Sequence, residues 1–267
     1  MSSTSFSYSR IQIFQNCPAK YRYVYLEKQS PAGEAIESFL GSRLHEALEW
    51  LYRERRTGRN ILFDDLLGQF RSVWRETWHD SIRVIEPGRQ IDDYYGLGQR
   101  CLAGYYRQYA PFDEPVEQVE LSVTFDLDDS GNYEMTGVLD RLDSQGPGWW
   151  SIHDYKSGKT LLTSSKAARD LQMRIYYLGL LRTLPDVQQV DVKWHFLRYG
   201  KEIGIDSVTW QPSRISTMLK KRIDRIREAE SQPENLATNE TMLCNWCYYW
   251  HVCPAKAGQQ HPALRSK

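Results

Sequence analysis

The chain has 267 residues, with 34 Lys and Arg against 34 Asp and Glu, and 41% of its residues are hydrophobic. This is the composition of one large globular domain, and its zero net charge argues against a uniformly basic surface while leaving room for a local basic groove. No apolar run approaches the roughly 18 residues of a membrane-spanning helix, and the polar start lacks a signal pattern, so we expect a soluble, cytoplasmic protein with no membrane partner.

The first 110 residues have the three- and four-residue apolar spacing of helices. We predict helices over residues 9–25, 36–55, 63–78 and 91–109. Pro18 interrupts the first of these, because proline removes a helical hydrogen bond and clashes with the preceding turn.

The pattern changes to strands after this helical part. Three strands over residues 116–127, 133–143 and 149–156, joined by turns at 128–132 and 145–148, predict an antiparallel meander. A helix over residues 164–184, strands over 189–197 and 203–210, and a helix over 211–231 follow. The order predicts an α/β (α+β) fold, in which helices pack on a mixed sheet.

Two carboxylates and a lysine are the sharpest local feature. Asp140 lies in Gly-Val-Leu-Asp-Arg-Leu-Asp (137–143), and Asp154-Tyr-Lys156 follows fourteen residues later. Asp154 and Lys156 share one face of a strand, and the intervening turn folds Asp140 back beside them. Hard oxygen ligands of this kind suit Mg²⁺ or Mn²⁺, which can activate a water, while Lys156 offsets developing charge.

The same residues also allow a structural interpretation. Asp140 and Arg141 could be surface residues at a strand end, and Asp154 could begin a turn that ends at Gly158. Arg141 and Asp143 are best interpreted as partners that support the site.

Other polar residues point to the same place. His45 lies one helical turn after Gly41, and Gln172 and Tyr176, four residues apart, share one helix face. Glu120 lies on the first strand of the meander. A lone helical His is more often a packed or surface residue than a ligand, and Glu120 could be either a further ligand or an exposed strand charge.

In their order along the chain, these motifs resemble the RecB-like branch of the PD-(D/E)XK nuclease superfamily. The matching segments are Gly-x-x-x-His (41–45), Gly-x-x-Asp-Arg-x-Asp (137–143), Asp-Tyr-Lys (154–156), Gln-x-x-x-Tyr (172–176), Ser-Tyr-Ser (7–9) and Cys-Pro-Ala-Lys-Tyr (17–21). The resemblance spans nearly the whole chain. It implies a restriction-endonuclease-like fold, with a mixed central sheet flanked by helices, and a metal-dependent DNA nuclease activity.

The resemblance also implies roles for single residues. The metal would be bound by His45, Asp140, Asp154 and the main-chain carbonyl of Tyr155. Lys156 would be the catalytic lysine, and Gln172 and Tyr176 would position DNA and the site. Glu120 matches an acidic position often seen in this branch.

Four of the five cysteines indicate a metal centre. Cys244 and Cys247 have C-x-x-C spacing, Cys253 follows, and Cys17 in its Cys-Pro segment is the candidate fourth ligand. Cys101 lies within a helical run and is interpreted as a small buried residue.

Two metals fit this cysteine set. Zinc would accept four cysteines, or three cysteines with His251. The division into one N-terminal and three C-terminal cysteines resembles the iron–sulfur staple of AddB-type and CRISPR-associated adaptation nucleases, so we favour a structural [4Fe-4S] cluster over zinc. The staple would join residues 233–267 to Cys17 within a single domain, next to a helical part (1–112) and a catalytic core (113–232).

Basic and aromatic side chains extend the prediction to a nucleic acid. The helix expected over residues 211–231 carries Lys220, Lys221, Arg222, Arg225 and Arg227, which form either a solvated or a phosphate-binding face. The aromatic residues Trp246, Tyr248, Tyr249 and Trp250 either stack on bases or pack around the cluster.

The sequence contains no P-loop, so any motor belongs to another protein. The leading hypothesis is a DNA exonuclease that acts on single strands or DNA ends, in repair, recombination or CRISPR adaptation. One alternative is an end-processing subunit that works with a CRISPR integrase or a helicase. The other is a zinc-stapled DNA-binding protein without catalysis.

Overall fold

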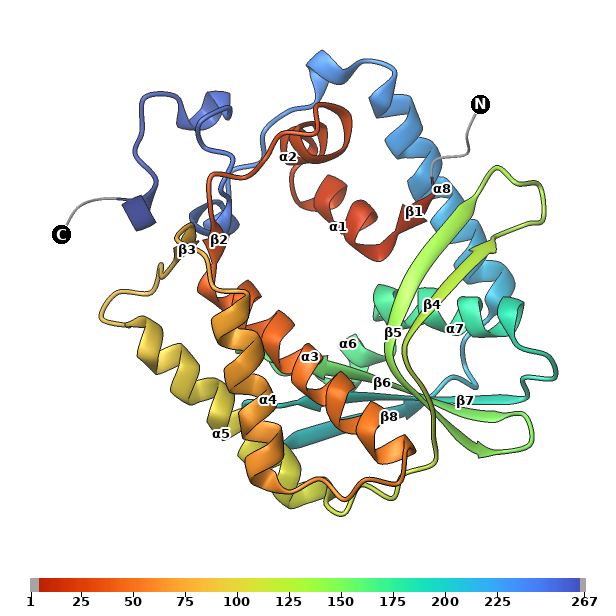
Figure 1. Cartoon of the computed structure of the whole chain (residues 1–267). Helices are drawn as coiled ribbons and strands as arrows, with labels where there is room; N and C mark the ends of the chain where they lie inside the picture. The colour runs from red at the N-terminus through yellow and green to blue at the C-terminus, as the bar shows by residue number, and fades with distance from the viewer. Residues whose placement is uncertain (1–4, 265–267) are drawn as a thin grey trace.

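A mixed six-stranded sheet forms the centre of the structure, a computed structural model that describes residues 5–264 (Figure 1). Its strands are β1 (Phe6–Ser7), β4 (Val116–Asp126), β5 (Glu134–Gly146), β6 (Trp149–Lys156), β7 (Gln189–Phe196) and β8 (Lys201–Asp206). Strands β4, β5 and β6 form the predicted antiparallel meander. Strand β7 is parallel to β6, whereas β8 is antiparallel to β7 and the short β1 is parallel to β5. The predicted fold class, a mixed sheet flanked by helices, is confirmed.

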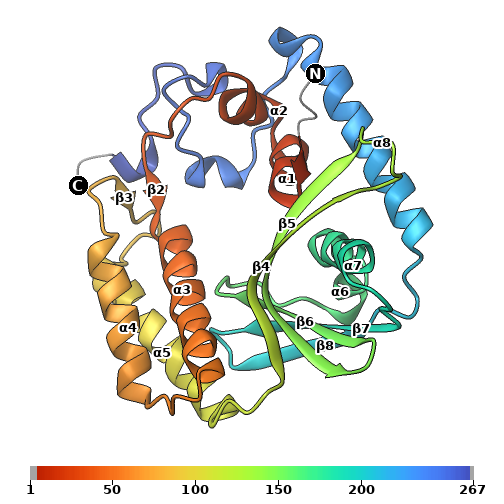
Figure 2. The ribbon, with the colours of Figure 1, turned by 45° about the vertical axis from the view of Figure 1, so that its right-hand side comes forward.

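Helices cover both faces of this sheet (Figure 2). One face packs on α1 (Tyr8–Asn16), α7 (Leu171–Thr183) and α8 (Pro212–Glu230), and the other on α3 (Ile36–Arg56), α4 (Phe63–Glu76) and α5 (Ile91–Tyr109). The central residues of β6 are therefore buried from Ser151 to Tyr155. A strand next to a parallel neighbour is usually covered on both faces in this way, which explains its continuous run of buried residues.

The N-terminal segment shows the interruption that Pro18 predicts. Helix α1 ends at Asn16, Cys17 is extended, and α2 (Pro18–Tyr21) continues into a π-helical turn over Arg22–Leu26. After this turn, the two-residue strand β2 (Glu34–Ala35) pairs with β3 (Ile82–Arg83).

Two predicted elements have different bounds in the structure. The single helix expected over residues 164–184 is two helices, α6 (Ser164–Ala167) and α7, because Asp170 caps α7 by accepting a hydrogen bond of 3.0 Å from the backbone N–H of Met173. The strand expected over residues 203–210 is β8, which ends at Asp206 because Ser207–Trp210 forms a turn closed by a backbone hydrogen bond.

The C-terminal segment consists of short 3₁₀ turns that return to the N-terminal helices. These turns cover Pro233–Asn235, Met242–Trp246, Pro254–Lys256 and Pro262–Leu264. The backbone N–H of Ala19 donates to Ala237 O over 3.1 Å, and the Asn239 amide donates to Asn16 O over 2.9 Å. Among the described residues, no helix has the length and apolar character needed to cross a membrane.

A buried ionic network lies behind the β5–β6 pair. Arg141 forms a two-bond ion pair with Asp143, with atoms 2.9 and 3.0 Å apart, and donates to the Tyr105 hydroxyl of α5 over 2.9 Å. His153 contacts Asp143 at 3.1 Å, and burial together with the Arg141 charge lowers the pKa of His153 to about 4. The network therefore connects the sheet to α5 through partners that are hydrogen-bonded, as buried charges require.

Two glycines of α5 allow a matched test of packing. A methyl group at Gly98 would lie 2.4 Å from Phe70 of α4, whereas at Gly104 it would meet nothing within 4 Å. We expect Gly98→Ala to destabilise the protein by about 1–3 kcal/mol through overpacking, and Gly104→Ala to stabilise it by up to about 1 kcal/mol through helix propensity. Urea unfolding of both variants would check this, and equal effects would contradict close packing at Gly98.

Candidate metal and catalytic site

The β5–β6 register places the two motif carboxylates on neighbouring strands. Arg141 pairs with His153, so Asp140 lies opposite Asp154. On the other side of β5, Val119 and Leu121 pair with Arg141 and Leu139, and Glu120 therefore lies beside Asp140. Three positions far apart in sequence thus meet at one point of the sheet.

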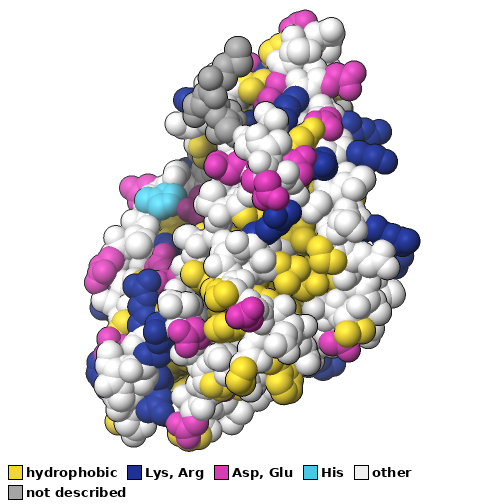
Figure 3. Space-filling model, turned by 90° about the vertical axis from the view of Figure 1, so that its right-hand side faces the viewer, with side chains coloured by type: hydrophobic (Ala, Val, Ile, Leu, Met, Phe, Trp, Pro, Cys, Tyr) yellow, Lys and Arg dark blue, Asp and Glu magenta, His cyan; other side chains and the backbone are white. Residues whose placement is uncertain are grey.

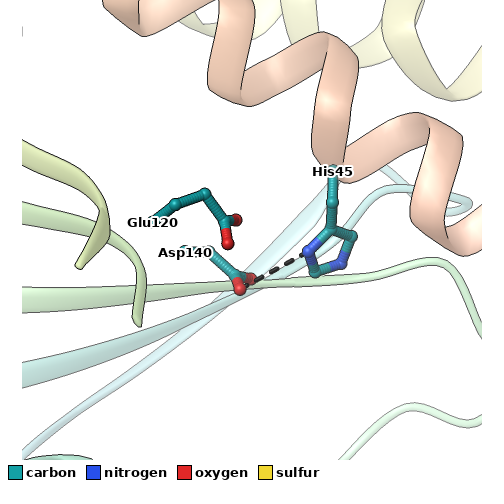
Figure 4. Close-up of side chains that lie close together, drawn as sticks. All are labelled: His45, Glu120 and Asp140. Atoms are coloured by element: carbon teal, nitrogen blue, oxygen red, sulfur yellow. Dashed lines mark ion pairs between the residues drawn. The ribbon is translucent and has the colours of Figure 1, made fainter. Parts of the chain in front are cut away.

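His45 of α3 completes this group from above the sheet. Figure 4 shows His45, Glu120 and Asp140 converging, and their potential ligand atoms lie within 4.8 Å of one another. His45 Nδ1 is 3.4 Å from Asp140 Oδ1, while its Nε2 is hydrogen-bonded to the Tyr155 carbonyl over 2.8 Å. The Tyr155 N–H donates to Asp140 Oδ2 over 2.8 Å.

Glu120 has an unusual backbone for a strand residue. Its φ of 49° lies in the left-handed region, which residues other than glycine seldom adopt and which concentrates at functional sites. The departure occurs where its carboxylate joins Asp140 and His45. The sequence left open whether Glu120 is exposed or part of the site, and the structure places it in the site.

A chain of side-chain contacts holds the lysine. The Lys156 ammonium is 2.7 Å from Asp154 Oδ2 and donates to Gln172 Oε1 over 2.9 Å. The Gln172 amide in turn donates to the Tyr176 hydroxyl over 2.9 Å. Helix α7 therefore fixes the lysine from outside the strand that carries it.

The motif glycines provide room for these contacts. A methyl group at Gly137 would lie 2.8 Å from the Tyr176 ring, and one at Gly41 would lie 3.2 Å from Ser157 Oγ. Gly137 therefore lets the α7 tyrosine lie against β5, and Gly41 lets α3, with His45, approach the end of β6.

Burial and neighbouring charges shift the pKa values of this site. Burial, with the Asp140 charge adding to it, raises the pKa of Glu120 to about 7. Burial raises the pKa of Asp154 to about 6, although Lys156 opposes the shift. For His45, burial alone would lower the pKa, but the charge and hydrogen bond of Asp140 outweigh it and raise the pKa to about 9. An excess of negative charge is the electrostatic condition that favours a bound cation.

The structure places every predicted site residue of the nuclease motifs in one region. Asp140 and Arg141 are 9% and 1% exposed, which excludes the interpretation that both are surface residues at a strand end. Tyr8 of α1 is a neighbour that the sequence did not single out. Burial raises its pKa, and the charges of Asp170, Lys156 and Asp154 also act on it. Only its place in the Ser-Tyr-Ser segment could have pointed to it.

The four cysteines proposed as a cluster also come together. Cys17, Cys244, Cys247 and Cys253 line one cavity of about 200 Å³, whereas Cys101 is buried in α5. None of the five forms a disulfide with another described residue. His251 is exposed and does not line this cavity.

Most aromatic residues near the three C-terminal cysteines pack against neighbouring groups, and one is exposed. Tyr249 stacks on Tyr23, with ring centroids 6.0 Å apart, and Tyr248 stacks on His261 at 4.7 Å. The Trp250 indole donates to the Cys244 carbonyl over 2.8 Å. Trp246 is the exposed member of the group, at 39%.

The sequence matches the model of the PD-(D/E)XK nuclease superfamily over residues 5–254. The chain therefore belongs to the PD-(D/E)XK nuclease superfamily, whose members are metal-dependent nucleases, and the family implies DNA as a substrate.

Two solved structures are similar to this one. A candidate exonuclease from Eubacterium rectale is 13% identical, with a TM-score of 0.55, and the match covers 100% of this chain and 91% of that chain. At this identity the likeness shows the fold alone. The structure of SSO0001 is also 13% identical, over 90% of this chain and 95% of that chain, with a TM-score of 0.36. A comparison with curated proteins finds no match.

Two glutamates of β4 test the metal site. We expect Glu120→Gln to weaken Mn²⁺ binding by about tenfold or more, since it removes a charged oxygen next to Asp140, while Glu117→Gln, at an exposed position of the same strand, leaves binding unchanged. Calorimetric titration of Mn²⁺ without DNA would measure both. Wild-type affinity in Glu120→Gln would show that Glu120 is not a ligand.

Proposed function

We propose that this chain is a Mg²⁺- or Mn²⁺-dependent DNA exonuclease of the RecB-like branch, acting on single strands or DNA ends. The observation that carries the proposal is a pair of contact groups on adjacent residues of β6. One group joins His45, Asp140 and Tyr155, and the other joins Asp154, Lys156 and Gln172. A structural role alone would not need a lysine held between a buried strand carboxylate, that of Asp154, and the side-chain amide of Gln172.

The donor set fits a hard divalent cation. His45, Asp140, Asp154 and the Tyr155 carbonyl would hold it, and Glu120 offers a further oxygen. One imidazole with several oxygens suits Mn²⁺ or Mg²⁺ better than a soft metal. When bound, the ion polarises a phosphodiester oxygen and lowers the pKa of an attacking water.

The protein's own residues position the other reacting groups. For Lys156, burial alone would lower the pKa, but Asp154 outweighs burial and raises it. Lys156 therefore stays protonated and acts as a hydrogen-bond donor and positive charge, not as a base. Gln172 and Tyr176 keep its ammonium aimed at the site, and Asp140 fixes the strand end through the Tyr155 N–H.

We further propose that Cys17, Cys244, Cys247 and Cys253 bind a [4Fe-4S] cluster. Their shared cavity supports a common centre. Zinc with three cysteines and His251 fits less well, because His251 lies outside the cavity lining. The cluster would close a loop that joins residues 233–267 to α2 and so stabilise the single domain, in which residues 1–112 are the helical part and 113–232 the catalytic core.

One observation favours a second function, that of an end-processing subunit. Met242, Leu243 and Trp246, next to the cysteine cavity, are 76%, 56% and 39% exposed. Adjacent exposed apolar side chains are typical of protein contact sites, so a partner such as a CRISPR integrase or a helicase could bind there. The complete set of site residues weighs against a DNA-binding protein without catalysis.

Lysine substitutions test the catalytic assignment. We expect Lys156→Ala to lower cleavage of end-labelled single-stranded DNA by roughly 10²–10⁴-fold with DNA binding retained, because the charge near the reacting phosphate is lost. Lys159→Ala, three residues further on and paired with Glu86 at the surface, should cleave normally. Normal cleavage by Lys156→Ala would refute the site assignment.

Cysteine substitutions test the cluster. We expect anaerobically purified protein to be brown and to contain about four iron atoms per chain. Cys247→Ser should lose iron and unfold at a lower temperature, whereas Cys101→Ser should keep its iron. A colourless, zinc-containing preparation would disprove the iron–sulfur assignment.

A further inference from the structure

The basic residues of α8 do not form one face but two flanks with different environments. On one flank, the Lys220 ammonium is 2.9 Å from Asp128 Oδ2, and Arg227 donates to the Asn132 carbonyl, so both side chains attach α8 to the β4–β5 hairpin. The opposite flank carries Arg214, Lys221, Arg222 and Arg225, at the spacing of successive helical turns. Within residues 5–264, none of these four side chains forms an ion pair or hydrogen bond.

This second flank borders a hollow of about 830 Å³, which we call the α8 hollow. Besides the four cations, the hydroxyl groups of Ser213 and Thr217 line it. Its one carboxylate, that of Asp224, accepts a hydrogen bond of 2.9 Å from the Tyr133 hydroxyl of the hairpin. Its lining thus offers mainly hydrogen-bond donors that carry positive charge. In the view of Figure 3, Lys and Arg side chains project along the right-hand edge of the molecule.

An arginine of α7 adds to this charge. Arg174 lies over Trp210, just before α8, with its guanidinium 5.7 Å from the ring centre, and donates to Ala168 O over 2.9 Å. Burial, followed by the charge of Arg174, lowers the pKa of Arg222. The charge of Arg174 thus acts on Arg222, and although Asp170 acts on Arg174 with the opposite sign, an anion would stabilise the two partly buried arginines.

We propose that the α8 hollow binds the phosphate backbone of the DNA strand outside the catalytic site. The inference rests on the proposed DNA substrate. Arg174, whose charge acts on Arg222 of the hollow, is two residues from Gln172, which bonds Lys156, so α7 carries residues that act on both places. Guanidinium groups bind phosphates through two parallel hydrogen bonds, and hydroxyl groups contribute single ones.

An acidic protein segment is the less favoured occupant. Protein interfaces contain apolar and aromatic residues at their centre, but Met218 is the one apolar residue in the lining of this hollow. A surface of cations and hydroxyl groups instead matches a backbone of repeated phosphates, which binds independently of base sequence.

The test measures binding without divalent ions, so that no DNA is cut. Fluorescent oligonucleotides of about 6 and about 20 deoxynucleotides would be titrated at several salt concentrations with the wild type and with Arg222→Gln/Arg225→Gln. The long strand should bind roughly tenfold more weakly to the variant at ~0.1 M salt, and the slope of log affinity against log salt should fall by about 1.4, or about 0.7 for each lost phosphate contact. The short strand should bind almost as it does to the wild type.

Two further variants control for charge and folding. Arg222→Lys/Arg225→Lys should restore most of the salt slope, because phosphate attraction depends mainly on charge. Arg56→Gln/Arg71→Gln removes two exposed arginines from α3 and α4 and should leave both oligonucleotides unaffected. If this control variant loses as much DNA affinity as Arg222→Gln/Arg225→Gln, the α8 hollow is not a specific DNA-binding surface.

Other outcomes would overturn the inference directly. It is wrong if the α8 variant binds the long strand with wild-type affinity and slope, or if both strands lose affinity equally. It is also wrong if DNA binding is unchanged while binding of a poly-glutamate peptide is lost, since the surface would then serve an acidic protein. If the wild type binds DNA through the hollow but does not cleave it with Mg²⁺ or Mn²⁺, the proposed nuclease function is wrong and the inference about the hollow stands.

Discussion

The antiparallel register of β5 and β6 is the constraint on which the site depends. Pairing of Arg141 with His153 sets Asp140 opposite Asp154, and a shift by one residue would move every side chain of one strand to the other face. The buried Arg141–Asp143–His153 network reinforces this register, since these partners lose their hydrogen bonds if the strands slip. The buried ionic network thus stabilises the strand register that places Asp140 opposite Asp154.

The site also depends on elements that approach the sheet from both sides. Helix α3 brings His45 to Asp140, and α7 brings Gln172 and Tyr176 to Lys156. A glycine makes room for each approach, Gly41 in one case and Gly137 in the other. The glycines of the motifs therefore have a packing reason, which is the close contact that their missing side chains permit.

Charge has a different distribution in each functional region of the molecule. Carboxylates dominate next to His45, where burial, with the charge of Asp140 adding to it, raises the pKa values of Glu120 and Asp154. Cations dominate on one flank of α8, where Arg222 and Arg225 have no acidic partner among the described residues. The zero net charge of the chain hides this separation, so composition alone could not reveal either region.

The sequence predicts the helices, most strand bounds and the shared face of Asp154 and Lys156, because these follow from periods of 3.6 and 2 residues. It also predicted the break at Pro18, but it missed the break before Asp170, where a cap interrupts an otherwise apolar helix. Only the tertiary structure shows that Glu120 joins His45 and that α8 divides its cations between two flanks. These outcomes depend on strand register and on packing between distant segments, which local periodicity does not encode.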